Sequence, residues 1–233
     1  MEMEKNAENR PLLRKAFLAV LVTVICTFLV LFVSAGTPRF WQAWAYMGVY
    51  TLYLVPGTFY LWKTAPDLLR RRLKWGPGAE KDPEQKVIQA VSFVLVVLLY
   101  LVPGLDRRFQ WTDVPVWMVS AGLAFFAVGL ASVFYVSRYN HYMAATITVE
   151  EGQPVVTTGP YALVRHPMYA GTLLWLFSTP VALGSFAGLI PAVMLCGTLV
   201  VRLLAEERFL RKNLAGYADY CEKVHWRLIP HVF

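Results

Sequence analysis

Residues 16–33 read AFLAVLVTVICTFLVLFV, an unbroken apolar stretch of 18 residues in which only Thr23 and Thr27 are polar. This stretch exceeds the apolar core of a secretory signal peptide, about 7–15 residues, and approaches the roughly 20 residues that cross a bilayer. We therefore expect a retained membrane anchor rather than a cleaved leader.

The composition extends this expectation to the whole chain. Hydrophobic residues make up 57% and charged residues 16% of the 233 positions, against about 45–50% and 25% in soluble domains. Such hydrophobicity excludes a disordered chain. The net charge of +7 would suit nucleic-acid binding in a soluble protein, but cytoplasmic loops of membrane proteins also collect Lys and Arg. We expect a membrane protein without a nucleic-acid partner.

Apolar blocks long enough to cross a bilayer recur along the chain. Four of them lie at 16–36, 41–62, 87–105 and 114–137. A fifth block, 168–201, is too long for one span and short for two, and its middle is rich in Gly, Pro and Ser. We expect a tight helical hairpin there, either spanning or deeply re-entrant. The predicted fold class is an all-α integral membrane protein, a multi-span bundle of four spans plus a C-terminal helical hairpin.

Basic residues flank these blocks unevenly. Nineteen Lys and Arg fall on the side of the N-terminus, whereas Arg39, Arg107 and Arg108 fall on the other. The positive-inside rule then predicts that both termini are cytoplasmic, in a prokaryotic cell membrane or the endoplasmic reticulum. We expect a four-span region over 1–137 and a catalytic region over 138–233, made of a cytoplasmic loop, the hairpin, and a cytoplasmic C-terminal helix and tail.

The loop before the hairpin contains β-branched residues, which predict either a short β-hairpin or an extended loop on the membrane surface. A short helix is expected over 161–166, after the turn signal Thr158-Gly159-Pro160. Pro167 suits the first turn of the hairpin's first helix.

Two polar clusters flank the hairpin. The first contains Tyr161, Arg165, His166 and Tyr169 at a helix start, where backbone N–H groups favour anions. The alternative is anchoring at the membrane interface, with the Arg165 side chain reaching lipid headgroups. Cytoplasmic Tyr217, Tyr220 and Trp226 of the tail are also open to two interpretations: aromatic anchoring, which we favour, or a lid that offers its rings to a cation.

The second cluster, after the hairpin, contains Arg202, Glu206, Glu207, Arg208 and Arg211. Its i,i+4 spacing predicts exposed ion pairs, Arg202 with Glu206 and Glu207 with Arg211, as one alternative to a binding site. Adjacent glutamates point about 100° apart on a helix, so at most one faces a given pocket. Because the hairpin helices are antiparallel, their cytoplasmic ends meet, and the two clusters together predict a site for a polar, zwitterionic ligand.

These residues resemble one superfamily. The motifs that carry the resemblance are Gly159-Pro160-Tyr161, Arg165-His166-Pro167-Met168-Tyr169-Ala170-Gly171, Glu206-Glu207, Gly216-Tyr217 with Tyr220, and Arg227-Leu228-Ile229-Pro230. The chain is similar, over about 138–233, to the integral-membrane methyltransferases typified by isoprenylcysteine carboxyl methyltransferase and phosphatidylethanolamine N-methyltransferase. The resemblance implies S-adenosyl-L-methionine as cofactor, in a pocket on the cytoplasmic side. No pair of the three cysteines has metal-ligand spacing, so we expect no metal.

The resemblance also implies residue roles. Tyr161, His166 and Tyr169 would contact the cofactor, and Glu206 or Glu207 would hold its ammonium or ribose. The expected catalytic residues are Arg165 and Arg202, which would orient a carboxylate, and Glu207.

The acceptor is left open between several classes. The lead-in to Tyr161, Thr157-Thr158-Gly159-Pro160, resembles that of isoprenylcysteine carboxyl O-methyltransferases, which implies a lipidic or amphiphilic carboxylate. The alternatives are N-methylation of phosphatidylethanolamine, NADPH-dependent reduction of a sterol or enone, and a non-catalytic membrane protein with a degenerate site.

Overall fold

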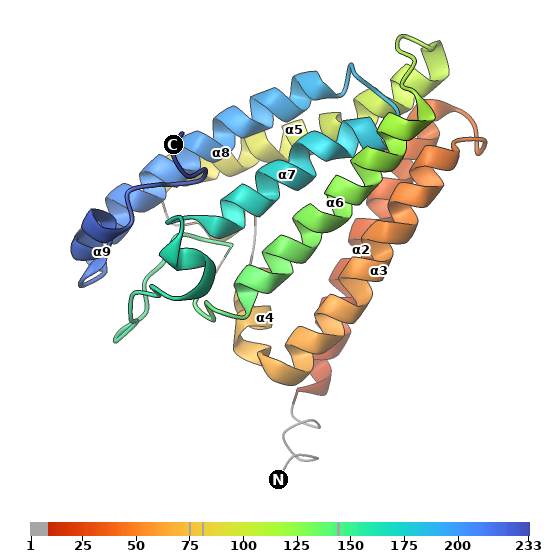
Figure 1. Ribbon diagram of the computed structural model, residues 1–233. Helices are drawn as coiled ribbons and strands as arrows, with labels where there is room; N and C mark the ends of the chain where they lie inside the picture. Colours follow the sequence, from red (N-terminus) through yellow and green to blue (C-terminus); the bar gives the residue numbers. More distant parts are fainter. Residues whose placement is uncertain (1–8, 75, 81, 144) are drawn as a thin grey trace.

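The computed structural model describes residues 9–233 except 75, 81 and 144 (Figure 1). The described chain is helical with irregular connections and contains no strand. Its elements in chain order are α2 (Arg10–Ala35), α3 (Trp41–Thr64), α4 (Pro66–Leu73), η1 (Pro77–Ala79), α5 (Pro83–Phe109), α6 (Val116–Ser137), η2 (Gly159–Ala162), α7 (Pro167–Ala182), α8 (Leu189–Asn213) and α9 (Tyr217–Lys223).

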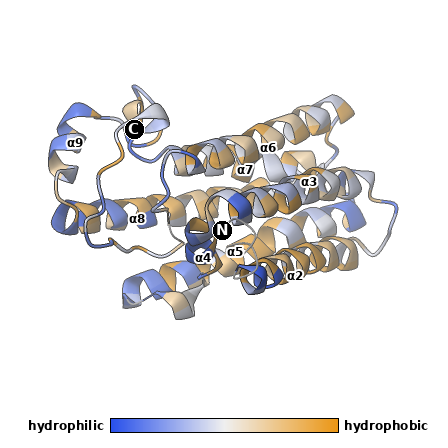
Figure 2. Ribbon diagram, turned by 90° about the horizontal axis from the view of Figure 1, so that it is seen from below, coloured by the Kyte–Doolittle hydropathy of each residue, from blue (hydrophilic) through white to orange (hydrophobic). Residues whose placement is uncertain are grey.

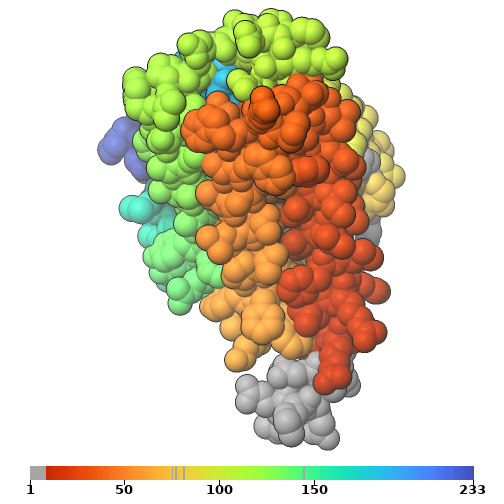
Figure 3. All heavy atoms as spheres, turned by 90° about the vertical axis from the view of Figure 1, so that its right-hand side faces the viewer, coloured from red at the N-terminus to blue at the C-terminus, as the bar shows by residue number. Residues whose placement is uncertain are grey.

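The predicted membrane class is confirmed. Four helices, α2, α5, α6 and α8, are long and apolar enough to cross a bilayer. The predicted span at 41–62 forms a helix, α3, which is not among these four but lies beside α2 along the height of the bundle (Figure 3). Hydrophobic colour follows the long helices, and hydrophilic colour gathers around α4 and α9 (Figure 2).

The hairpin predicted over 168–201 forms as α7 and α8. Gly184 in the turn has a φ of +73°, a left-handed conformation that glycine adopts without strain. Next to it, the Ser185 hydroxyl donates a hydrogen bond to the Asp106 carboxylate at the end of α5. The amide of Phe186 donates to Thr112, in the α5–α6 connection, at 3.2 Å. The tip of the hairpin therefore reaches the end of the bundle where α5 ends and α6 begins.

Glycines bring α6 and α7 into close contact. A Cβ at Gly129 would lie 2.7 Å from the backbone nitrogen of Trp175, and one at Gly122 would lie 2.6 Å from that of Ala182. Small residues let helix backbones approach, which is a usual way for membrane helices to associate. This contact fixes the start of α7, and hence the site, relative to α6.

We expect the replacement Gly129→Ala to destabilise the bundle by about 1–3 kcal/mol, because the added methyl group overpacks against the backbone of α7. Gly48→Ala on α3 is the matched control, since a Cβ there meets nothing within 4 Å. Thermal unfolding in detergent would compare the two variants. Equal midpoints would show that the close approach does not limit stability.

The start of α2 and the loop before the hairpin are fastened to α4. The Arg70 guanidinium donates to the side chain of Asn9 at 2.7 Å. Both oxygens of Glu150 accept hydrogen bonds from Arg71, each at 2.7 Å. The described residues of the loop form no strand, so the β-hairpin alternative is wrong for them. The position of the loop on the membrane surface stays a prediction.

The helix predicted over 161–166 is also wrong in extent. The helical turn η2 ends at Ala162, and His166 directly precedes α7, in which Pro167 occupies the first turn as predicted. The amides of Arg165 and His166 instead donate to the carbonyl oxygens of Trp226 and Arg227, each at 2.9 Å. These hydrogen bonds to the tail satisfy the donors that a helix would have used and join the tail to the start of α7.

Candidate functional site

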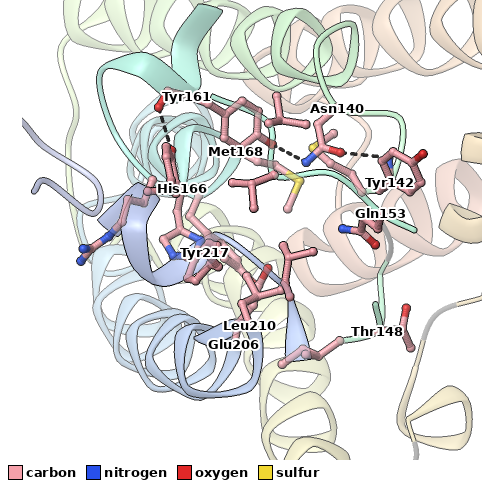
Figure 4. A pocket seen from close by; sticks show the side chains of 18 of the residues that line it. Asn140, Tyr142, Thr148, Gln153, Tyr161, His166, Met168, Glu206, Leu210 and Tyr217 are labelled. Carbon is pink, nitrogen blue, oxygen red and sulfur yellow. Dashed lines mark hydrogen bonds between the residues drawn. The ribbon is translucent and has the colours of Figure 1, made fainter. Parts of the chain in front are cut away.

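The start of α7, the second half of α8, the loop before the hairpin and α9 enclose a cavity of about 200 Å³ (Figure 4). Six of the predicted site residues line it, and Glu207 does not. These six are Tyr161, Arg165, His166, Tyr169, Arg202 and Glu206. The structure thus brings together the two clusters that flank the hairpin, as the antiparallel arrangement predicts.

Glu206 is the acidic residue that lines the cavity. Its side chain accepts a hydrogen bond from the hydroxyl of Tyr169 at 2.6 Å, and it takes part in none of the ion pairs of the described residues. A half-buried carboxylate whose partner is a neutral phenol can still accept a cation from a ligand.

Glu207 lies behind the cavity, with 4% of its surface exposed. Its Oε1 is 2.7 Å from Nε of Arg165 and 3.2 Å from Nε2 of His166, and its Oε2 is 2.9 Å from Nε of Arg227. Of the two adjacent glutamates, Glu206 faces the cavity and Glu207 fixes the residues around it.

The Arg165 contact is a charge pair without an aligned hydrogen bond, since Nε of Arg165 has no hydrogen-bond partner among the described residues. The side chain is buried, as is that of His166. Interface anchoring at lipid headgroups is therefore wrong for Arg165, because its guanidinium faces Glu207 inside the protein.

Arg202 faces a different carboxylate. Its Nη2 lies 2.8 Å from Oε1 of buried Glu80 and donates to the carbonyl oxygen of Ala145 at 2.7 Å. Gln89 also donates to Oε1 of Glu80, at 2.7 Å. The predicted i,i+4 ion pairs along α8 are wrong, because Arg202 pairs with Glu80 and Glu207 with the residues described above. This network ties the loop to α5 and α8.

Buried tyrosines form much of the cavity wall. The hydroxyl of Tyr220 donates to the carbonyl oxygen of Tyr161 at 2.7 Å, and Asn140 donates to the hydroxyl of Tyr161 at 3.1 Å. Burial raises the pKa of Tyr161 to about 12, so its phenol stays neutral at physiological pH. The Tyr217 hydroxyl is buried and has no hydrogen-bond partner among the described residues. Aromatic anchoring at the membrane interface is therefore wrong for Tyr217 and Tyr220, which are inside the site.

Sequence reasoning did not assign site roles to Asn140, Glu80 or Arg227. Arg227 belongs to the tail motif Arg227-Leu228-Ile229-Pro230, and this was the signal available in the sequence. Asn140 and Glu80 gave no local signal, because each meets the site through contacts between segments far apart in sequence.

Fold and site together define a class: a multi-span helical membrane protein that carries, at one end, an aromatic cavity with one open carboxylate. Residues 117–216 match the family described as phospholipid methyltransferase. Protein-S-isoprenylcysteine O-methyltransferase A of Arabidopsis thaliana is 31% identical over 147 residues, 58% of this chain and 70% of that protein. A probable protein-S-isoprenylcysteine O-methyltransferase of Oryza sativa subsp. indica is 34% identical over 122 residues, 47% of this chain and 60% of that protein.

A solved structure of a eukaryotic intramembrane Ras methyltransferase, isoprenylcysteine carboxyl methyltransferase, has a TM-score of 0.45 at 16% identity, over 92% of this chain and 85% of that one. This likeness is too distant to add to the sequence relationship. The relationship itself is sufficient: the chain belongs to the isoprenylcysteine O-methyltransferase family and is an integral-membrane methyltransferase. The predicted class of enzyme is confirmed.

Proposed function

We propose that this methyltransferase takes S-adenosyl-L-methionine as its methyl donor and an amphiphilic carboxylate, such as an isoprenylated cysteine, as its acceptor. The observation that carries the proposal is the Glu206 carboxylate, open to a cavity that tyrosines line in part. The relatives named as isoprenylcysteine O-methyltransferases support the acceptor class.

The residues of the cavity fit the donor. Glu206 would hold its ammonium group, since it is the acidic side chain on the wall and has no basic partner among the described residues. The unpaired hydroxyl of Tyr217 would supply a hydrogen bond to a polar group of the donor. The rings of Tyr161 and Tyr220 would lie against a cation. S-Adenosyl-L-methionine supplies an electrophilic methyl group on a sulfonium.

A carboxylate acceptor asks little of the protein beyond position. Carboxyl groups are ionised at physiological pH, so the acceptor needs no general base. The chain would align the two reactants in the cavity and exclude water from it. His166 would contact the donor from the wall, whereas Glu207 would act by holding Arg165, His166 and Arg227 in place. Arg202 would position the loop through Ala145.

We further propose that the end of the bundle that carries the cavity faces the cytoplasm, in a prokaryotic cell membrane or the endoplasmic reticulum. The contact between Asn9 and Arg70 places the start of α2 beside α4. The bonds from Arg165 and His166 to the tail place the C-terminal segment at the cavity. At the opposite end of the bundle, Arg39 precedes α3, and Arg107 and Arg108 lie in the last turn of α5. The division into a membrane region, 1–137, and a catalytic region, 138–233, stays a prediction. Glu80 of the first region contacts Arg202 of the second.

Transfer of a labelled methyl group tests this function. The purified protein would be incubated with labelled donor and, separately, with a prenylated N-acetylcysteine and with phosphatidylethanolamine. We expect label in the prenylated cysteine that is released by base, as a methyl ester is. Base-stable label in the phospholipid would instead show N-methylation, and absence of transfer to either acceptor would overturn the proposal.

A further inference from the structure

Helix α4 carries three consecutive arginines with different surroundings. Arg70 lies 2.8 Å from Asp67, and Arg71 binds both oxygens of Glu150. Arg72 takes part in no ion pair among the described residues. The hydrogen bond that its guanidinium makes is a weak one, to the sulfur of Met168 at 4.0 Å.

Arg72 lies beside the cavity without lining it, because its guanidinium contacts Met168, which is one of the lining residues. Met168 lies at the start of α7 and lines the cavity, as does Tyr161. The guanidinium of Arg72 lies near the phenol groups of Tyr161 and of Tyr53 on α3. Its side chain is half-buried, and burial lowers its pKa from the ordinary value. Nevertheless, arginine remains a cation at physiological pH.

The other arginines at the site already face carboxylates. Arg165 and Arg227 share Glu207, and Arg202 pairs with Glu80. The two arginines that sequence reasoning favoured for orienting a carboxylate, Arg165 and Arg202, therefore each have a carboxylate partner within the chain, although Arg165 shares its partner with Arg227. A partly buried cation without a counter-charge is unfavourable, and an anionic ligand would relieve that cost.

We propose that Arg72 binds the carboxylate of the methyl acceptor, an inference that rests on the proposed function. The planar guanidinium fork matches a carboxylate with two parallel hydrogen bonds, which would fix the orientation of the attacking oxygen. The acceptor then approaches from α3 and α4, beside Met168, while the donor lies towards Glu206 and α9.

The experiment compares Arg72→Gln with Arg70→Gln, which removes the same charge two positions earlier on α4, where the arginine contacts Asp67 and Asn9. The substrate is a prenylated N-acetylcysteine, and its uncharged carboxamide is the competing ligand. For Arg72→Gln we expect the KM for the carboxylate to rise at least about 30-fold, as for loss of a charge-assisted pair, with the donor affinity within about twofold. Arg72→Lys should recover part of the loss, and Arg70→Gln should leave KM unchanged.

The carboxamide ligand distinguishes a structural role of Arg72 from direct binding of the acceptor carboxylate. The unchanged protein should bind the carboxylate more tightly than the carboxamide, and Arg72→Gln should lose this preference. An unchanged KM and preference in Arg72→Gln would overturn the assignment. A second result would also overturn it: Arg72→Gln keeps its KM, but vesicles of phosphatidic acid stabilise the unchanged protein and not the variant. That result would identify a lipid phosphate as the ligand of Arg72. Absence of methyl transfer by the unchanged protein would instead refute the proposed function, and this inference with it.

Discussion

Replacing Glu207 with glutamine is expected to lower the free energy of unfolding by about 3–5 kcal/mol, as for a buried ion pair that loses one partner. Glutamine keeps the shape of the side chain but removes its negative charge. Arg165 and Arg227 would then face each other without a counter-charge, in a place where the glutamate is 4% exposed. Thermal unfolding in detergent measures the effect.

Activity should fall with stability in this variant. Arg165 and His166 line the cavity and are held by Glu207, and a displacement of about 1 Å costs on the order of 100-fold in rate. The double variant Glu207→Gln, Arg227→Gln also removes one of the two arginine charges that the loss of Glu207 leaves without a counter-charge. It should therefore recover part of the stability. Glu206→Gln, one residue earlier on α8, is the matched control. If both single variants unfold at the same temperature, the buried cluster does not stabilise the fold.

The comparison of Glu206 with Glu207 also shows what sequence could predict. The 100° separation on a helix correctly limits the cavity to one of the two glutamates. Which one it is depends on the rotation of α8 about its axis, in which Glu206 meets Tyr169 and Glu207 meets Arg227. No pattern within α8 encodes that rotation.

Helix existence was predictable because long apolar stretches are local signals. The blocks at 16–36, 87–105 and 114–137 lie within or close to the bounds of α2, α5 and α6. The partners in the ion pairs were not predictable, because they are not local in the sequence. The spacing of Arg202 and Glu206 favours a local pair, but the guanidinium instead reaches Glu80, which is 122 positions away in sequence. A buried carboxylate is a stronger partner than an exposed one because water screens it less.

Arg72 illustrates the same limit on the functional side. In the sequence it is one of several basic residues that a cytoplasmic loop would collect anyway. Only its position beside Met168, and the carboxylates already taken by its neighbours, distinguish it from Arg70 and Arg71.

Replacing Glu206 with glutamine is expected to raise the Kd for S-adenosyl-L-methionine about 30- to 150-fold, since a lost hydrogen bond to a charged group costs about 2–3 kcal/mol. The carboxylate is the acidic group on the cavity wall, and its partner in the chain is the neutral hydroxyl of Tyr169. Isothermal calorimetry on the purified protein in detergent measures the affinity. Thermal stability should change little, because Glu206 is not part of the buried cluster around Glu207.

A second ligand makes this prediction specific. 5′-Deoxy-5′-methylthioadenosine shares the adenosine and sulfur of the donor but lacks its amino-acid ammonium and carboxylate. Its affinity should be nearly the same for Glu206→Gln and for the unchanged protein, because the contact removed is the one to the ammonium. Glu222→Gln, an exposed change on α9, controls for the loss of one negative charge. Equal losses of affinity for both ligands would mean that Glu206 shapes the cavity and does not hold the ammonium.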